Sequence, residues 1–398
     1  MTIAKKVDAM IEKSSWIRKM FEDGARLKAE NGAGNVFDFS LGNPNVKPPA
    51  IFRETLKEFV CSDEISDREM YHGYMPNTGY PHVREAVAKF ISREQNVSLS
   101  GDDVIMTSGA SGALNAIFKA ILDPGDEVLT PRPYFVEYGS YVDNHGGVLK
   151  IAPTASDFHL DIDAMEAAIT EKTKAVLINS PHNPTGQIYR EEDLKQLGRL
   201  LAEKGKKWNK TIYLVSDEPY RKIVYKGASV PSIFLCYDET IMATSYSKDI
   251  SIPGERIGFM AVNPKSRHRE KLLAGLALTN RVLGFVNAPA LMQRVVGAIQ
   301  GASVDISVYA KKMDMLCDGL SDCGYEFTKP AGAFYLFPKS PIPDDVEFVA
   351  RLQEELILTV PGTGFGGPGY FRIAFCVDDA VIANAMPGFK RALESYKK

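Results

Sequence analysis

Three short apolar runs, each lying between helix-like segments, constrain the fold of this 398-residue chain more than any other feature. The runs are Ala175-Val176-Leu177-Ile178, Ile212-Tyr213-Leu214-Val215 and Thr240-Ile241-Met242-Ala243-Thr244. Continuous runs of this kind predict strands that are buried on both faces, as in parallel sheets with helices on either side. Apolar residues at helical spacing predict helices over 83–91 and 114–122. We therefore expect an α/β fold with a mostly parallel central sheet, followed after about residue 287 by a smaller α+β region.

A polar residue that could bind a ligand or take part in catalysis follows each of the three runs. These residues are Asn183, Asp217 and Lys248. In open α/β sheets, ligands bind beyond the carboxyl ends of the strands, so one crevice could collect all three side chains. The sequence therefore predicts a single active site at this edge of the sheet.

Lys248 is followed eight residues later by a second cation, Arg256. A lysine that is desolvated in a cleft has a lowered pKa and becomes nucleophilic. An amine close to a fixed guanidinium suits a ligand with both a carbonyl group and an anionic group. Pyridoxal phosphate carries both groups.

The surrounding segments resemble the signatures of the class I and II aminotransferases, which use pyridoxal phosphate. Four segments occur in the family's order: Thr107–Gly112, Asn179–Gly186, Ser216–Tyr220 and Ser245–Gly258. The resemblance runs from Gly42 to Arg372 and implies the pyridoxal-phosphate-dependent transferase fold of type I. It implies an N-terminal segment (1–44) that joins the small domain, a large cofactor-binding domain (45–286) and a small C-terminal domain (287–398).

The resemblance also implies a role for each residue around the cofactor ring. Lys248 forms the internal aldimine and later moves the proton between the substrate Cα and the cofactor C4′. Asp217 keeps the pyridine nitrogen protonated, so that the ring accepts electron density. Asn183 and Tyr220 hydrogen-bond to the 3′ oxygen. Phe135 stacks on the ring, and its neighbour Tyr134 stays open as the alternative.

The remaining implied contacts involve the phosphate and the substrate. The phosphate lies at a helix N-terminus, where its expected partners are Gly109, Ala110, Ser111, Ser245 and Arg256. Tyr74 is expected to reach the phosphate of a neighbouring subunit, so that the enzyme is complete only as a homodimer. Arg372 is expected to bind the α-carboxylate of the substrate, with Gly42 and Asn183 beside it. No metal is expected.

The expected reaction is transfer of an amino group from an L-amino acid to a 2-oxo acid. A β-lyase or a γ-elimination synthase uses the same lysine and cofactor, so this alternative stays open. Ser245 and Lys248 also fit the Ser-x-x-Lys motif of penicillin-binding hydrolases. The Ser-Asp-Asn and Lys-Thr-Gly strings that accompany this motif do not occur in the chain.

Bulk properties narrow the classes of partner and compartment. A net charge of −3 gives no electrostatic footprint for nucleic acid or an anionic membrane surface. No apolar run approaches the ~20 residues of a membrane span. The five cysteines form no Cys-x-x-Cys pair, which is typical of reduced thiols. We therefore expect a cytoplasmic enzyme.

Two features leave their roles open. Arg281 lies near the position where dicarboxylate-specific relatives place a second substrate arginine, one residue out of register. An apolar stripe at helical spacing near the N-terminus could dock on a partner subunit, close over the site or pack in the core. Its residues are Val7, Met10, Ile11, Ile17, Met20 and Phe21.

Overall fold

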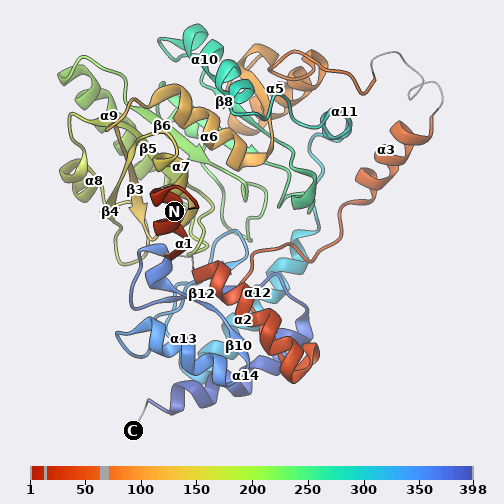
Figure 1. The fold of residues 1–398 in the computed structure, drawn as a ribbon, viewed down its shortest axis with the longest axis vertical. Helices are drawn as coiled ribbons and strands as arrows, with labels where there is room; N and C mark the ends of the chain where they lie inside the picture. Colours follow the sequence, from red (N-terminus) through yellow and green to blue (C-terminus); the bar gives the residue numbers. More distant parts are fainter. Residues whose placement is uncertain (1, 13–15, 63–70, 397–398) are drawn as a thin grey trace.

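The computed structural model describes residues 2–12, 16–62 and 71–396 and divides them into two lobes (Figure 1). The strands of the upper lobe are β2 (Val104–Thr107), β3 (Glu127–Arg132), β4 (Val148–Pro153), β5 (Thr173–Asn179), β6 (Tyr213–Asp217), β7 (Thr240–Ser245) and β8 (Gly258–Val262). Its helices are α3 (Ala50–Cys61), α5 (Pro81–Gln95), α6 (Gly109–Ile121), α7 (Glu137–Asp143), α8 (Ile162–Ala168), α9 (Glu191–Lys207), α10 (Arg269–Val282) and α11 (Ala290–Ala298).

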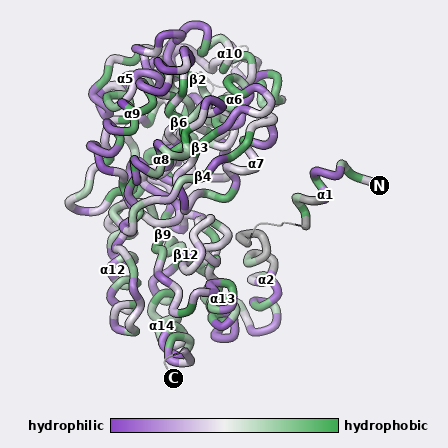
Figure 2. The backbone as a smooth tube through the Cα atoms, turned by 90° about the vertical axis from the view of Figure 1, so that its left-hand side faces the viewer, coloured by the Kyte–Doolittle hydropathy of each residue, from purple (hydrophilic) through white to green (hydrophobic). Residues whose placement is uncertain are grey.

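The lower lobe contains most of the last hundred residues together with part of the N-terminal segment. Its elements are α2 (Trp16–Asn31), β1 (Phe37–Asp38), α12 (Ile306–Cys323), β9 (Tyr335–Leu336), α13 (Asp345–Glu354), β10 (Ile357–Leu358), β11 (Val360–Pro361), β12 (Phe371–Ala374) and α14 (Asp379–Glu394). Helix α1 (Lys5–Glu12) precedes them and projects from the body of the molecule (Figure 2).

The upper lobe is built on a seven-stranded sheet with the order β2-β8-β7-β6-β5-β3-β4. Strands β7, β6, β5, β3 and β4 run parallel, and β8 is antiparallel to both of its neighbours. The expectation of a mostly parallel sheet is therefore confirmed. The predicted strand runs match β5, β6 and β7, except that Ile212 precedes β6, and the predicted helices match α5 and α6, except that Leu122 is the C-cap of α6.

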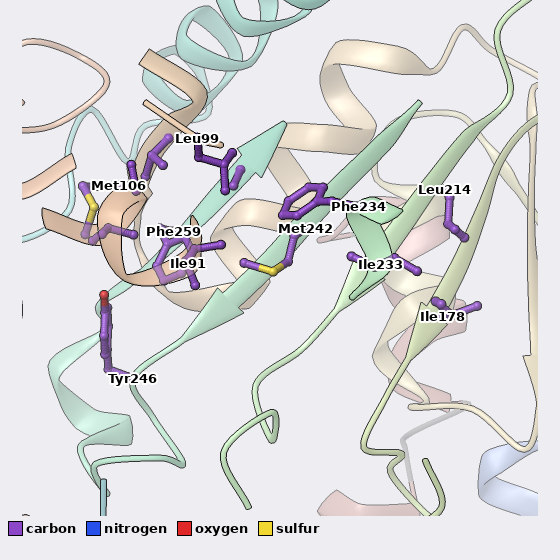
Figure 3. Close-up of a cluster of buried hydrophobic side chains, with 14 of the residues drawn as sticks. Ile91, Leu99, Met106, Ile178, Leu214, Ile233, Phe234, Met242, Tyr246 and Phe259 are labelled. Atoms are coloured by element: carbon purple, nitrogen blue, oxygen red, sulfur yellow. The ribbon is translucent and has the colours of Figure 1, made fainter. Parts of the chain in front are cut away.

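Both faces of the sheet are covered by helices, as the apolar runs predicted. Val176 and Ile178 of β5 face the core shared with α5, α8, α9 and α11 (Figure 3). Ala175 and Leu177 face the opposite core, shared with α6, α7 and α10. Successive side chains of a strand point to opposite faces, so both parities must be apolar when both faces are buried.

The lower lobe has a separate core around two small sheets. Strands β11, β12 and β9 form an antiparallel sheet, and β1 pairs in parallel with β10. The apolar run Ile357-Leu358-Thr359-Val360 does not form one continuous strand. Instead, β10 and β11 join different sheets, because the chain leaves β1 after Leu358 and pairs with β12 from Val360.

The N-terminal apolar stripe splits into two parts. Val7, Met10 and Ile11 are exposed, whereas Met20 is buried in the core of the lower lobe. The side chains of Ile17 and Phe21 lie outside the described part of the structure. Among the helices that the structure describes, none has the length and apolar character needed to cross a membrane.

Candidate active site

A cavity of about 310 Å³ lies between the two lobes, beyond the carboxyl ends of β5, β6 and β7. It brings together eleven of the predicted site residues: Gly42, Ala110, Ser111, Phe135, Asn183, Asp217, Tyr220, Ser245, Lys248, Arg256 and Arg372. Gly109 lies directly behind Arg256, and Tyr74 lies elsewhere. The cavity volume is in the range of small-molecule binding sites.

Lys248 follows the end of β7 and reaches the cavity from the large sheet. Its Nζ donates a hydrogen bond of 2.7 Å to the carbonyl oxygen of Gly42. Burial lowers the pKa of Lys248 to about 8; the Cys376 thiol opposes this shift, and the charges of Arg372 and Arg256 add to it. The unprotonated, nucleophilic amine is therefore more accessible near neutral pH than it is for an exposed lysine.

Asp217 is the last residue of β6 and is buried at the floor of the cavity. Its Oδ2 accepts a hydrogen bond of 2.7 Å from the hydroxyl of Tyr138, and its Oδ1 has no partner among the described residues. Burial raises the pKa of Asp217 to about 7; the Tyr138 hydrogen bond lowers this pKa, and the charge of Glu218 raises it. A buried carboxylate oxygen without a donor is costly, so it marks a place where a ligand donor fits.

Asn179 fixes the relative positions of two site residues. Its Nδ2 donates to the Asp217 carbonyl oxygen (2.8 Å), and its Oδ1 accepts from the backbone N–H of Asn183 (2.7 Å). Asn179 and Asp217 are also register partners on β5 and β6. One buried amide therefore joins the ends of two neighbouring strands to the turn that carries Asn183.

Arg372 on β12 is only 2% exposed and faces the cavity from the lower lobe. Its Nη1 donates to Asn183 Oδ1 (3.1 Å), and its Nη2 donates to the Ser40 carbonyl oxygen (2.6 Å). The guanidinium lies between the rings of Tyr335 (4.9 Å) and Phe365 (4.7 Å). These contacts hold the guanidinium plane in a fixed orientation, as bidentate recognition of a carboxylate requires.

The opposite end of the cavity is lined by the N-terminus of α6. Gly109 begins this helix with a positive φ of 71°, and a Cβ there would lie 2.8 Å from Nη2 of Arg256. Ser108 makes no capping hydrogen bond, so its side chain leaves the first N–H groups of α6 open. Arg256 is exposed at the cavity mouth and has a left-handed φ of 52°. The open N–H groups and the guanidinium are together suited to a multiply charged anion.

Two adjacent aromatic residues competed for the ring-stacking position, and the structure separates them. Phe135 lines the cavity and packs edge-on against Tyr138, with ring centroids 5.6 Å apart. Tyr134 is absent from the lining, and its backbone N–H donates to the Phe365 carbonyl oxygen. The geometry therefore favours Phe135.

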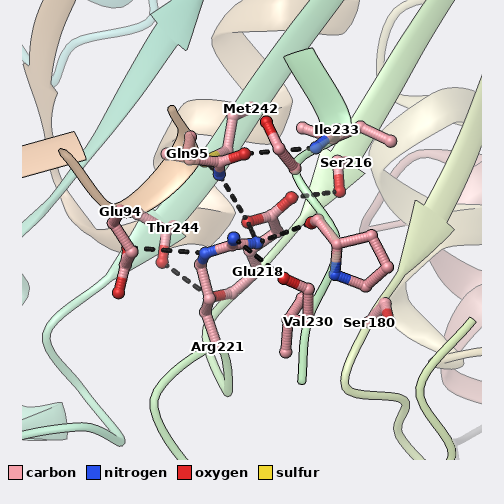
Figure 4. A network of polar contacts seen from close by, with 12 residues as sticks. Glu94, Gln95, Ser180, Ser216, Glu218, Arg221, Val230, Ile233, Met242 and Thr244 are labelled. Atoms are coloured by element: carbon pink, nitrogen blue, oxygen red, sulfur yellow. Dashed lines mark hydrogen bonds and ion pairs between the residues drawn. The ribbon is translucent and has the colours of Figure 1, made fainter. Parts of the chain in front are cut away.

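Glu218 adjoins Asp217 in sequence but belongs to a polar network behind the site (Figure 4). Its Oε1 accepts from Ser216 (2.7 Å), and its Oε2 accepts from Arg221 (3.0 Å) and Gln95 (3.3 Å). Arg221 also pairs with Glu94 (3.4 Å). This network anchors the backbone turn between Asp217 and Tyr220.

Two residues considered from the sequence lie outside the cavity. Tyr74 is 88% exposed and lines a separate hollow of about 490 Å³ with residues 72–75 and 285–288. Arg281 is exposed in the last turn of α10. Neither contributes to the site within this one copy of the chain.

The structure adds cavity residues that the sequence reasoning missed. Tyr138, Tyr141 and Tyr335 all line the cavity, as does Asn179. Tyr335 stands in the apolar run Ala333–Phe337, where an aromatic residue is usually core, whereas Tyr138 and Tyr141 lie among polar and small residues. The available signal was the three-residue spacing of Tyr138 and Tyr141, which places both on one face of α7.

Solved structures and curated relatives resemble the chain over nearly its full length. The crystal structure of an aminotransferase from Eubacterium rectale has a TM-score of 0.96 at 39% identity and covers all of both chains. Thermus thermophilus aspartate aminotransferase with maleate has a TM-score of 0.86 at 28% identity, covering 99% of this chain and all of the other. A probable aspartate/prephenate aminotransferase of Thermus aquaticus is 35% identical, covering 89% of this chain and 91% of the relative.

The fold and the full-length similarity define a type I pyridoxal-phosphate-dependent transferase architecture. The sequence profile described as aminotransferase class I and II matches residues 34–388, so the chain belongs to this family. It is therefore an aminotransferase, from a family whose members use pyridoxal phosphate. This assignment favours transamination over the elimination reactions that the sequence left open.

Proposed function

We propose that the enzyme transfers the amino group of an L-amino acid to a 2-oxo acid, in two half-reactions, with pyridoxal phosphate in the cavity. The observation that carries this proposal is that one cavity contains both a buried lysine with a lowered pKa, Lys248, and a buried carboxylate, Asp217. One oxygen of this carboxylate has no donor among the described residues. Lys248 suits an aldehyde, and Asp217 Oδ1 suits a ring N–H. The relatives named for aspartate and prephenate support an amino acid substrate.

The cavity residues fit this cofactor along its whole length. The open N–H groups of α6, with Ser111, Ser245 and Arg256, suit the phosphate. Phe135 offers a ring face, and Asn183 and Tyr220 suit the 3′ oxygen. When bound, pyridoxal phosphate supplies an electron sink for the carbanion formed at the substrate Cα.

Each protein group then has a defined task. Lys248 would hold the aldehyde group of the cofactor, and its freed amine would carry the proton that leaves the substrate Cα. Arg372 binds the α-carboxylate, with Asn183 fixing its guanidinium. Among the described residues that line the cavity, the cations are Lys248, Arg256 and Arg372. Arg256 is assigned to the phosphate and Arg372 to the α-carboxylate, so neither is free for the side-chain carboxylate of a substrate such as aspartate. The activity test therefore compares aspartate with uncharged amino acids.

The test follows the absorbance of the purified, cofactor-loaded protein as single amino acids are added. Conversion of the bound cofactor to its pyridoxamine form, with release of the matching oxo acid, is expected. Lys248→Ala should bind the cofactor without turning over. Release of ammonia instead would assign an elimination reaction, and normal turnover by Lys248→Ala would contradict the role of the lysine.

The functional enzyme is a homodimer in which Tyr74 completes the phosphate site of the other subunit. Tyr74 is exposed, yet its loop is firmly held. Arg294 lies 4.2 Å from the rings of both Tyr71 and Tyr80, and Asn287 Nδ2 donates to the Pro76 carbonyl oxygen (3.0 Å). Because these contacts already hold the loop in place, little conformational entropy is lost when Tyr74 binds to a partner subunit.

Mixed dimers test this arrangement. If Tyr74 acts across the interface, a dimer of one Lys248→Ala subunit and one Tyr74→Phe subunit contains one fully native site. Mixing the two variants should then raise activity above the sum of the separate variants. No gain on mixing, with subunit exchange verified by differently tagged chains, would place Tyr74 within its own subunit or outside the reaction.

The domain division at residues 44 and 286 stays a prediction. Pairing of β1 with β10 supports an N-terminal segment that joins the small domain. Helix α11 packs its Met292, Val295 and Val296 into the core of the upper lobe. This packing favours a second boundary further along the chain than residue 286.

A further inference from the structure

A buried pair of tyrosine hydroxyls joins the two lobes at the cavity. Tyr220 follows β6 of the upper lobe, Tyr335 lies on β9 of the lower lobe, and their hydroxyl oxygens are 2.8 Å apart. Their rings meet edge to face, with centroids 5.5 Å apart. Both residues line the cavity, and Tyr335 had no role in the interpretation of the sequence.

Tyr335 also contacts the groups that bind the substrate carboxylate. The Arg372 guanidinium lies over its ring at 4.9 Å. A Cβ at position 42 would overlap the Tyr335 hydroxyl, so only glycine lets the backbone pass there. Gly42 in turn accepts the hydrogen bond from Lys248. Tyr335 therefore touches the surroundings of the carboxylate site and of the reactive lysine.

The direction of the tyrosine hydrogen bond follows from the proposed role of Tyr220. If Tyr220 donates its proton to the cofactor 3′ oxygen, its own oxygen can only accept from Tyr335. Hydrogen bonds in such a chain polarise each other, so Tyr335 makes Tyr220 a stronger donor. A stronger donor on the 3′ oxygen favours the more negative state, in which the nitrogen joined to Lys248 is unprotonated.

We propose that Tyr335 is a positioning residue that couples the carboxylate site at Arg372 to the cofactor oxygen held by Tyr220. This inference rests on the proposed function and adds a link between its two subsites. An anion on Arg372 neutralises the charge next to the Tyr335 ring. Tyr335 then becomes a weaker donor, and the proton affinity of the nitrogen on Lys248 rises.

The charged and titratable groups around the pair come from several elements. Arg372 on β12 faces both tyrosines, and Asp217 on β6 faces Tyr220. The Cys376 thiol, just after β12, faces both Tyr335 and Lys248. Burial raises the pKa of Tyr335 to about 12 and that of Tyr220 well above its usual value, so both keep their protons throughout the working pH range.

Tyr335→Phe is the direct test, because it removes the hydroxyl and keeps the ring under Arg372. Absorbance titration of the cofactor-loaded enzyme reports the pKa of the nitrogen joined to Lys248. We expect Tyr335→Phe to raise this pKa by about 0.5 pH unit, the scale of one relayed hydrogen bond. Saturating propionate, a carboxylate without an amine, should also raise this pKa in the wild-type enzyme. In Tyr335→Phe the rise caused by propionate should be smaller.

Tyr225→Phe is the matched control. Tyr225 is a buried tyrosine in the same core, its hydroxyl donates to the Ala333 carbonyl oxygen, and it does not line the cavity. Its removal should leave both titrations at the wild-type values. Unchanged titrations in Tyr335→Phe, or equal changes in Tyr225→Phe, would overturn the coupling. A wild-type protein with no lysine-linked chromophore would instead remove the proposed function itself.

Discussion

Asp217 and Glu218 are neighbours in sequence, and both are buried carboxylates, but their surroundings differ completely. Glu218 accepts hydrogen bonds from Ser216, Arg221 and Gln95 behind the sheet. Asp217 faces the cavity with one donor, Tyr138, and one oxygen that has none among the described residues. Because successive residues at the end of a strand point in opposite directions, one carboxylate became structural and the other stayed available for chemistry. Satisfied hydrogen-bonding capacity thus separates the two roles where residue type and burial do not.

The largest expected effect comes from Asp217→Asn, which keeps the shape of the side chain and removes its charge. The aminotransferase rate should fall by several orders of magnitude, because the electron sink loses its anionic partner. The free energy of unfolding should change little, since the amide still accepts from Tyr138. Steady-state kinetics and urea unfolding measure the two quantities. A mild loss of rate would remove Asp217 from the mechanism.

Glu218→Ala should show the reverse pattern. We expect the free energy of unfolding to fall by about 3 kcal/mol, because Arg221 stays buried without its main charged partner. The rate per folded molecule should remain within about tenfold of wild type. Glu94→Gln, at the more exposed end of the network, is the control and should cost under about 1 kcal/mol. Wild-type stability in Glu218→Ala would contradict the structural role.

The smallest effect concerns the single donor of Asp217. Tyr138→Phe removes the hydrogen bond that lowers the pKa of this carboxyl, so the pKa should rise from its value of about 7. The proposed role of Asp217 requires its ionised form, so activity should fall more at pH 6 than at pH 8.5. A pH–rate profile measures this difference. Tyr141→Phe is the control, because that hydroxyl donates to Ser111 instead (3.0 Å). An identical acidic limb in Tyr138→Phe and wild type would show that the hydrogen bond does not tune the site.

The sequence predicted the parts of the site that follow from sheet geometry. Asn183, Asp217 and Lys248 meet because parallel strands end at one edge, and their strands were visible as apolar runs. Arg372 could be proposed only through the family resemblance, since an arginine within an apolar strand is more often a structural ion-pair partner. The choice between Phe135 and Tyr134 needed the structure. In a loop, the directions of two adjacent side chains depend on local backbone angles, and sequence periodicity does not predict these angles.

Other features could not be predicted because they depend on contacts between distant segments. Tyr335 meets Tyr220 across 115 positions of sequence, and in a run of aromatic residues it resembled ordinary core. The apolar run at 357–360 did not indicate that its two halves pair with different strands. The position of Tyr74 in a second subunit remains a prediction, because one copy of the chain contains only half of that proposed contact.

The amide of Asn179 has a consequence for how this protein can change over evolutionary time. It bonds to the backbone of two residues with different tasks, Asp217 and Asn183, and to neither of their side chains. A substitution there would displace the proposed partner of the ring nitrogen, Asp217, and the neighbour of Arg372, Asn183, together, even if both of these residues were retained. Drift at this position would therefore disturb two parts of the site at once, while the side chains proposed to act there stay unchanged in sequence.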